Sequence, residues 1–183
     1  MNNDALPGML PDVDKAARLS PDGRYRYWLR RRWAGRDGVG VRYRLVTFVM
    51  LNPSTADAEL DDPTIRRCQS FARSWGYDGI MVVNLYALRS TDPKGLWLDG
   101  DPVGPRNDSH LRIAAFFAQY DDTPIVAAWG ANARPERVAE VLAIPHMDRL
   151  TCLGVTKDGS PRHPLYVRGD TPTTAWPPPG RVT

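Results

Sequence analysis

The chain has 183 residues, of which 42% are hydrophobic and 25% charged, values typical of a globular domain that can bury a sizeable core. No run reaches the roughly 18 consecutive apolar positions of a membrane-spanning helix, and the N-terminus lacks the basic-then-apolar order of a signal peptide. We therefore expect a cytoplasmic protein with no membrane partner. Cys68 and Cys152 have neither zinc nor redox spacing, so both are expected as small buried hydrophobes.

The formal net charge is +3, but the charge is unevenly distributed. Residues 24–44 hold eight arginines against a single aspartate, Asp37, which gives this stretch a local charge of +7. Arginine suits bidentate contact with phosphate, so the stretch is compatible with a nucleotide or nucleic-acid partner. The alternative, which the sequence slightly favours, is a solvated strand face in an arginine-rich protein that has only three lysines.

The pattern of the chain divides it into an arm, one domain and a tail. Residues 1–20 show no sustained periodicity and are expected to form a loosely attached arm. Residues 21–168 form the predicted α/β domain, and the proline-rich residues 169–183 an extended tail. Arginine and aromatic residues alternate at 24–29 and again at 41–46, which predicts an antiparallel hairpin at one edge of the sheet.

The run from Val46 to Leu51 is apolar or β-branched throughout, which is typical of a strand buried on both faces. Pro53 ends this strand because it has no N–H group to donate, so Asn52 lies at the carboxyl end of the strand. Open α/β sheets bind ligands at this edge, although Asn-Pro-Ser-Thr is also favourable turn chemistry. This stretch alone favours the turn and the ligand site equally.

Helical and strand patterns alternate along the rest of the domain. The alternation predicts a three-layer sandwich with a largely parallel, four-stranded central sheet, in addition to the N-terminal hairpin. The expected helices start at a capping residue or at a proline in the first turn. Strands are predicted at 81–86, 124–130 and 150–155, and helices beginning near Asp62, Asn107 and Pro135.

Distinctive groups follow four of the strands: Asn52, Asn84, Trp129-Gly130 and a loop with His163. The carboxyl ends of parallel strands lie on one edge, so these groups are expected to converge. The sequence has no nucleophile elbow and no glycine-rich phosphate loop, which argues against covalent acyl transfer and against P-loop or dinucleotide enzymes. The histidines are scattered, and we expect neither a metal nor a cofactor.

Three longer segments carry a resemblance to a known family. They read LNPSTAD at residues 51–57, DDPTIRR at 61–67 and KDGSPRHPLY at 157–166. Together they are similar to the signature of an uncharacterised bacterial and phage family, catalogued as domain of unknown function sixteen-forty-three. The resemblance runs from about Tyr25 to Val167, and the family implies no activity.

A second, more distant resemblance does imply an activity. The uracil-DNA glycosylase superfamily has, in chain order, a Gly-Ile-Asn-Pro or Gly-Gln-Asp-Pro turn, a Leu-Leu-Leu-Asn strand end, a Leu-Trp-Gly strand end and a His-Pro-Ser-Pro loop. Four motifs of this chain resemble these in the same order, each at a predicted strand end or its loop. They are Met50-Leu51-Asn52-Pro53, Val82-Val83-Asn84, Ala128-Trp129-Gly130 and His163-Pro164.

This resemblance implies a glycosylase-like fold and a role for each matched residue. Asn52 would position a water for attack on the sugar carbon, and His163 would stabilise negative charge on the leaving base. Asn84 would hydrogen-bond the Watson–Crick edge of an extruded base. The remaining candidates are Tyr86 and Trp129 for stacking on the base, Arg89, Arg162 and Lys157 for phosphates, and Asp57 and Asp61 as a general base, although helix capping explains these aspartates more simply.

The chain also departs from the superfamily pattern. Ser54-Thr55 replaces the Tyr-His of the uracil-specific class, so thymine need not be excluded. The loop after His163 lacks the Ser-Pro-Leu wedge that enters the minor groove. Three functions stay open: a glycosylase acting on a modified or mismatched base, a catalytically inactive nucleotide or nucleic-acid binding module, and a phage DNA-modification enzyme. The expected partner is a nucleotide or single-stranded or modified DNA.

Overall fold

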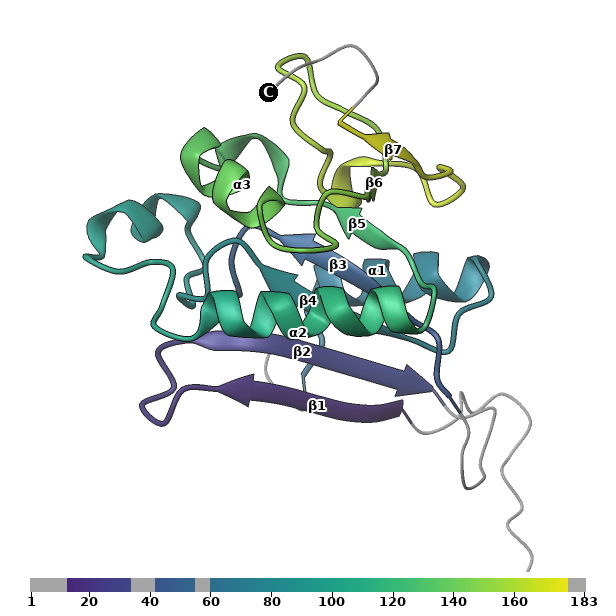
Figure 1. Cartoon of the computed structure of the whole chain (residues 1–183), viewed down its shortest axis with the longest axis horizontal. Helices are drawn as coiled ribbons and strands as arrows, with labels where there is room; N and C mark the ends of the chain where they lie inside the picture. Colours follow the sequence, from purple (N-terminus) through teal and green to yellow (C-terminus); the bar gives the residue numbers. More distant parts are fainter. Residues whose placement is uncertain (1–12, 34–41, 55–59, 178–183) are drawn as a thin grey trace, which may run out of the picture.

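A computed structural model describes residues 13–33, 42–54 and 60–177 of the chain. Within these residues, strands and helices alternate as an α/β fold (Figure 1), which confirms the predicted fold class. The strands are β1 (Val13–Leu19), β2 (Arg26–Trp33), β3 (Leu45–Met50), β4 (Gly79–Asn84), β5 (Ile125–Ala127), β6 (Leu150–Cys152) and β7 (Thr174–Trp176); the α-helices are α1 (Pro63–Ser74), α2 (Asn107–Tyr120) and α3 (Pro135–Leu142); short 3-10 helices are η1 (Pro93–Leu98), η2 (Gly130–Asn132) and η3 (Pro164–Tyr166).

The strands form one seven-stranded mixed sheet in the order β1-β2-β4-β3-β5-β6-β7. Strands β4, β3, β5 and β6 are parallel, which confirms the predicted four-stranded parallel core. The chain adds β4 on one side of β3 and then β5 on the other side. The carboxyl ends of β3 and β5 therefore form a topological switch point, the place where open α/β sheets bind ligands.

The predicted hairpin is wrong in its pairing. Strand β2, expected to pair with residues 41–46, pairs antiparallel with β1 and with β4. Leu45 and Val46 belong to β3 and run parallel to β4, while Val41 lies outside the described residues. Alternation defines the two faces of a strand but not its neighbour, so the pattern did not identify the partner. Strand β1 comes from the stretch expected to be a loose arm, of which residues 1–12 lie outside the described residues.

Part of the predicted tail also belongs to the sheet. Strand β7 pairs antiparallel with β6. Trp176 is buried, and its ring packs edge-on against Trp129 with 4.9 Å between the ring centroids. The residues from 174 to 176 therefore cover one side of the strand end where Trp129 lies, and residues 178–183 are outside the described part.

Helix α1 begins where its sequence predicts. The Asp62 carboxylate accepts a hydrogen bond from the N–H of Ile65 at 2.8 Å, and Pro63 occupies the first turn. Beyond the C-terminus, Gly76 has φ +77°, a left-handed conformation that glycine adopts without strain. The apolar side of α1 packs on one face of the sheet through Ile65, Cys68 and Phe71.

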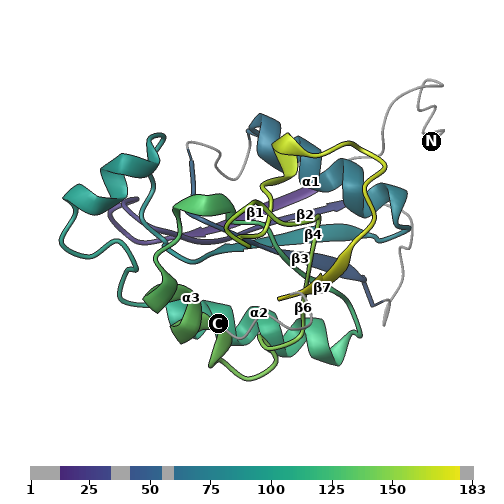
Figure 2. The ribbon, with the colours of Figure 1, turned by 90° about the horizontal axis from the view of Figure 1, so that it is seen from above.

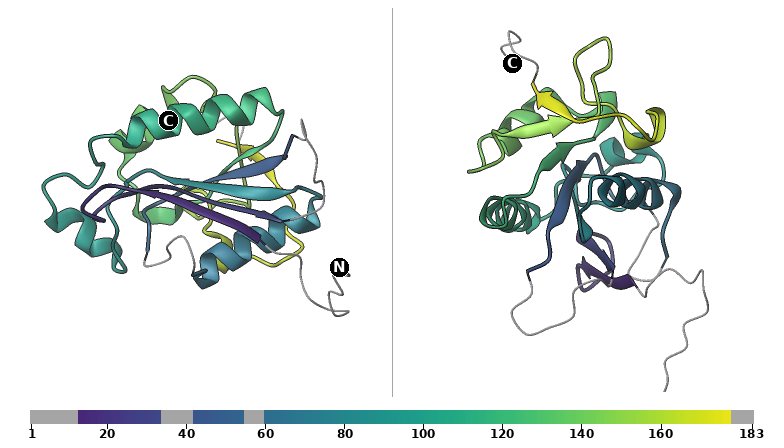
Figure 3. Two further views of the ribbon diagram at one scale, coloured as in Figure 1. Left: turned by 90° about the horizontal axis from the view of Figure 1, so that it is seen from below. Right: turned by 90° about the vertical axis from the view of Figure 1, so that its right-hand side faces the viewer.

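Helices α2 and α3 lie on the opposite face of the sheet from α1 (Figure 2), and the right panel of Figure 3 shows α1 and α2 on the two sides of the strands. The sheet is therefore the middle of three layers. Each face carries its own apolar cluster, built on Phe48 and Val82 on the α1 side and on Val49 and Leu85 on the α2 side. None of the described helices is both long and apolar enough to span a membrane.

The start of α2 differs from the prediction. Asn107 does not cap this helix, because it is the first helical residue and it is fully buried. Its side-chain Nδ2 donates hydrogen bonds to the main-chain oxygens of Asn84 and Leu85, each at 3.0 Å. Asp108 forms an ion pair with the buried Arg137 of α3. Asn107 thus ties α2 to the carboxyl end of β4.

Candidate functional site

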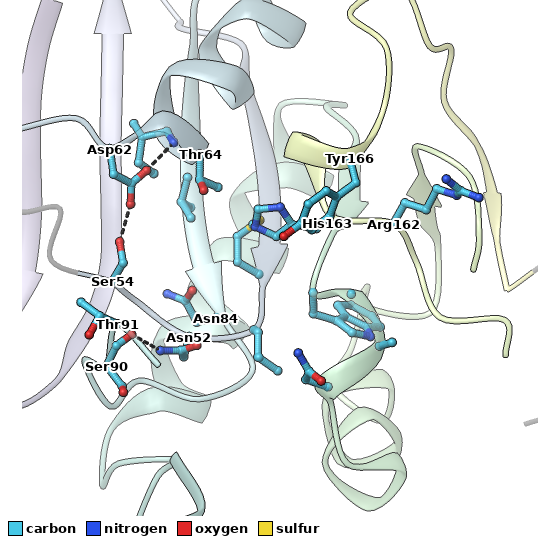
Figure 4. A pocket seen from close by; sticks show the side chains of 18 of the residues that line it. Asn52, Ser54, Asp62, Thr64, Asn84, Ser90, Thr91, Arg162, His163 and Tyr166 are labelled. Carbon is cyan, nitrogen blue, oxygen red and sulfur yellow. Dashed lines mark hydrogen bonds between the residues drawn. The ribbon is translucent and has the colours of Figure 1, made fainter. Parts of the chain in front are cut away.

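A cavity of about 610 Å³ opens at the carboxyl edge of the parallel strands, on the α1 side of the sheet. Its walls come from the segment after β3, the segment after β5, the first turn of α1 and the loop that precedes η3. Asn52 and Asn84 line one side and His163 and Tyr166 the other (Figure 4). The cavity therefore occupies the switch point between β3 and β5.

Asn84, the last residue of β4, is the most distinctive group of the cavity. The residue is only 1% exposed, yet neither its side-chain nitrogen nor its side-chain oxygen has a hydrogen-bond partner among the residues that the structure describes. A buried polar group without a partner costs about 1–3 kcal/mol, so native structures rarely keep one without a use for it. The Asn84 amide is placed to give one donor and one acceptor to a ligand.

Asn52 is half-buried beside it and is fixed by the protein. Its Nδ2 donates to the main-chain oxygens of Ser90, at 2.9 Å, and of Pro53, at 3.0 Å. The N–H of Ser90 in turn donates to the oxygen of Pro53 at 2.9 Å. These bonds leave Oδ1 as the atom of Asn52 that can accept a hydrogen bond from a water or ligand in the cavity.

His163 faces the two asparagines from the other wall. Its Nδ1 accepts a hydrogen bond from the N–H of Leu165 at 3.3 Å, which places the proton of the neutral ring on Nε2. Burial lowers the pKa of His163 below its ordinary value, and the nearby carboxylate of Asp62 opposes this only in part. His163 is therefore a neutral hydrogen-bond donor at pH 7.

Asp62 has two roles at the cavity. One carboxylate oxygen caps α1, as predicted, while the other accepts a hydrogen bond from the Ser54 hydroxyl. Asp62, Ser54 and Thr64 all line the cavity, so the first turn of α1 forms part of its wall. The sequence indicated the cap but not that the cap faces the site.

Basic residues dominate the charge of the cavity. Arg26 lines it from β2 and is 2% exposed, and Lys157 and Arg162 lie exposed on the rim. The Nε of Arg162 donates to the main-chain oxygen of Val155 at 3.0 Å, which positions this side chain. Among the described lining residues Asp62 is the single carboxylate, so the cavity favours an anionic or phosphate-bearing ligand.

The structure brings together Asn52, Asn84, Trp129, Lys157, Arg162 and His163, but it places other candidates elsewhere. Tyr86 is buried on the α2 side, where its hydroxyl accepts from the N–H of Arg134 at 3.4 Å. Arg89 donates to the main-chain oxygen of Gly23 at 3.2 Å. Asp61 pairs with Arg31 at 2.7 Å and therefore links α1 to β2. Asp57 lies outside the described residues.

Several lining residues were not identified from the sequence. Arg26 belongs to a run of alternating arginine and aromatic residues, and nothing in that run distinguishes it from its neighbours. The long loop after β4 offered a signal, because long loops in compact domains are usually functional or mobile. The residues missed are Arg26, Ser54, Thr64, Ser90, Thr91, Asn132, Thr156 and Tyr166.

The fold and the cavity define an α/β protein with an amide-, hydroxyl- and imidazole-lined cavity at the switch point of its sheet. Nowhere in the described part of the chain do three or more His, Cys, Asp or Glu side chains gather in a way that could hold a metal ion. The chain belongs to the family described as Protein of unknown function (DUF1643), whose family model matches residues 26–165. This match confirms the family resemblance of the sequence motifs. No curated protein and no solved structure matches the chain.

Proposed function

We propose that the protein is an N-glycosyl hydrolase that acts on a modified or mismatched base in DNA or in a nucleotide. The observation that carries the proposal is the side chain of Asn84, which is buried in the cavity and whose two polar atoms have no partner in the described part of the chain. An amide presents a donor and an acceptor side by side, which matches the hydrogen-bonding edge of a base. The motif resemblance to the uracil-DNA glycosylase superfamily points to the same role.

The neighbouring groups supply what the hydrolysis needs. A water that donates to Oδ1 of Asn52 attacks the sugar carbon as the bond between that carbon and the base nitrogen breaks, and the proton that this water loses ends on the released base, so that the products are a sugar hydroxyl and the neutral base. The bonding electrons pass to the base, where the Nε2–H of His163 stabilises the developing negative charge. Removal of one such preorganised donor typically lowers a rate constant by about 10²–10³-fold.

The rim of the cavity suits a nucleotide that is part of a nucleic-acid chain. Tyr166 is 78% exposed at the cavity mouth, with its ring centroid 5.6 Å from that of His163. An exposed aromatic ring gives a stacking surface for a neighbouring base, and Lys157 and Arg162 can contact backbone phosphates. Trp129, which is buried, forms the wall against which the extruded base packs.

Base release tests the proposal directly. The protein is incubated with single- and double-stranded oligonucleotides that contain uracil, mispaired thymine or 5-substituted pyrimidines, and abasic sites are then assayed. We expect release from at least one substrate, and its loss in Asn52→Ala and His163→Asn. His146→Asn is the matched control, because His146 is exposed and lies outside this cavity.

The alternative is a binding module that has lost catalysis. Binding of these oligonucleotides without abasic sites in any of them, and with equal affinity in Asn52→Ala, would support this alternative and refute the hydrolase. In that case Asn84→Leu would still abolish binding, because both functions use the same buried amide.

A further inference from the structure

Helix α2 presents a second apolar face, which points away from the sheet. Its inner face is buried through Leu111, Ala114, Ala115 and Ala118. Its outer face carries four large hydrophobic side chains at helical spacing, and we call these four the α2 stripe. They are Ile113 (51% exposed), Phe116 (56%), Phe117 (53%) and Tyr120 (56%). An amphipathic helix of a monomer normally keeps this side polar, so the α2 stripe marks an interaction surface.

The stripe is an ordered surface that continues beyond the helix. The rings of Phe116 and Tyr120 are stacked at 13° with centroids 6.2 Å apart, and the guanidinium of Arg42 lies 4.4 Å from the centre of the Tyr120 ring. Beside the helix, a groove of about 330 Å³ is lined by Trp28 and Met81 together with two residues of the stripe. Helix and groove thus form one contiguous apolar surface on the α2 side of the molecule.

The charges at the two ends of α2 indicate which partner fits. Arg106 directly precedes the helix, and Asp121 and Asp122 directly follow it. Two copies of α2 that pack antiparallel with Arg106 of each chain beside Asp121 of the other place the two-fold axis between residues 113 and 114, so that Ile113 lies at the centre and Phe116 flanks it. We propose that the protein forms a homodimer in which the α2 stripe packs against the same stripe of a second copy about a two-fold axis.

The proposed interface leaves the cavity free. The cavity lies on the α1 side of the sheet and contains none of the four stripe residues, whereas α2 lies on the other side (Figure 3). Both cavities of the pair remain open. The dimer and the proposed hydrolase activity can therefore be tested independently of each other. Variants of the stripe are expected to leave oligonucleotide binding unchanged.

Sedimentation velocity at several protein concentrations tests the proposal. One chain has a mass of 20.5 kDa, and we expect a species of twice that mass. Phe116→Asp places two charges in the interface and is expected to raise the dissociation constant by roughly 30-fold or more, the effect of losing a contact near the centre of the interface. Leu98→Asp is the matched control, since Leu98 is 90% exposed and lies in η1, away from the stripe.

Single cysteines test the antiparallel geometry. We expect Arg106→Cys and Asp121→Cys to form little disulfide when oxidised alone but to cross-link efficiently when mixed, because each faces the other across the two-fold axis. The native Cys68 and Cys152 are buried and do not compete. A monomer at all concentrations, a dimer that Phe116→Asp does not weaken, or cross-linking only between identical variants would overturn the proposal. A lasting complex with a different protein on this face would also overturn it.

Discussion

The side-chain Nδ2 of Asn107 lies 3.0 Å from the main-chain oxygen of Asn84, so a fully buried residue of α2 holds the strand end that carries the main polar group of the cavity. The same nitrogen donates to the oxygen of Leu85 at 3.0 Å. Leu85 directly follows the end of β4. The two bonds therefore satisfy the carbonyl groups of Asn84 and Leu85 at the point where the hydrogen bonding between strands ends. The position of Asn84 therefore depends on a contact between residues that are 23 positions apart.

Asn107→Ala removes both bonds and leaves the buried Asn84 oxygen without this donor, while the Leu85 oxygen keeps the hydrogen bond from Nε of Arg137 at 2.9 Å. We expect the free energy of unfolding to fall by about 1–3 kcal/mol, measured by urea denaturation. Asn132→Ala is the control, because Asn132 is exposed, and its effect should stay within about 0.5 kcal/mol. Equal stabilities of the two variants would show that Asn107 does not support the strand end.

Asn84→Leu is expected to have opposite effects on stability and on binding. The substitution replaces a buried amide that has no partner among the described residues by an apolar side chain of the same branched shape, so the free energy of unfolding should stay the same or rise by about 1 kcal/mol. Oligonucleotide binding should be lost. A loss of more than about 1 kcal/mol would mean that Asn84 serves the fold and not a ligand.

Substitution of Asp61 distinguishes a structural role in the ion pair with Arg31 from a catalytic role as a general base. The Arg31 side chain that pairs with it is 0% exposed, so Asp61→Ala removes the carboxylate from a buried guanidinium. We expect the free energy of unfolding to fall by about 1–3 kcal/mol, because Arg31 loses the carboxylate but keeps its bond to the main-chain oxygen of Arg30. Asp170→Ala is the matched control, because its pair with Arg168 is largely exposed, and its effect on the free energy of unfolding should be much smaller than that of Asp61→Ala. A stable Asp61→Ala protein without base release would instead support the general-base role.

The depressed pKa of His163 predicts a pH dependence of stability. Burial lowers the pKa of His163 in the folded protein, whereas the unfolded chain keeps the ordinary value of 6.5. The unfolded state therefore binds more protons, so stability is complete above pH 6.5 and falls as the pH decreases toward the folded pKa. His110 has the same sign, because burial also lowers its pKa.

Chemical denaturation at a series of pH values measures this effect. We expect His163→Asn to flatten the loss of stability below pH 6.5, and His163→Asn combined with His110→Asn to flatten it further. A wild-type profile in the His163 variant would contradict a folded-state pKa below the ordinary value.

Local patterns in the sequence were sufficient for the parallel core and for the polar residues that follow its strands into the cavity. Buried runs mark the strands, and Asp62 with Pro63 marks the start of α1, because burial and capping are encoded within a few residues. Asn52, Asn84, Trp129 and His163 meet because parallel strands end on a common edge.

Only the tertiary structure determined which segments of the chain pair with each other. The pairing of β2 with β1, the pairing of β7 with β6, and the bonds of Asn107 to the end of β4 all join segments that carry no local signal for each other. The same holds for Asp61, which pairs with Arg31 of β2, and for Arg26, which turns into the cavity. Alternation and capping set the face and the ends of an element, whereas its neighbours depend on the packing of the whole sheet.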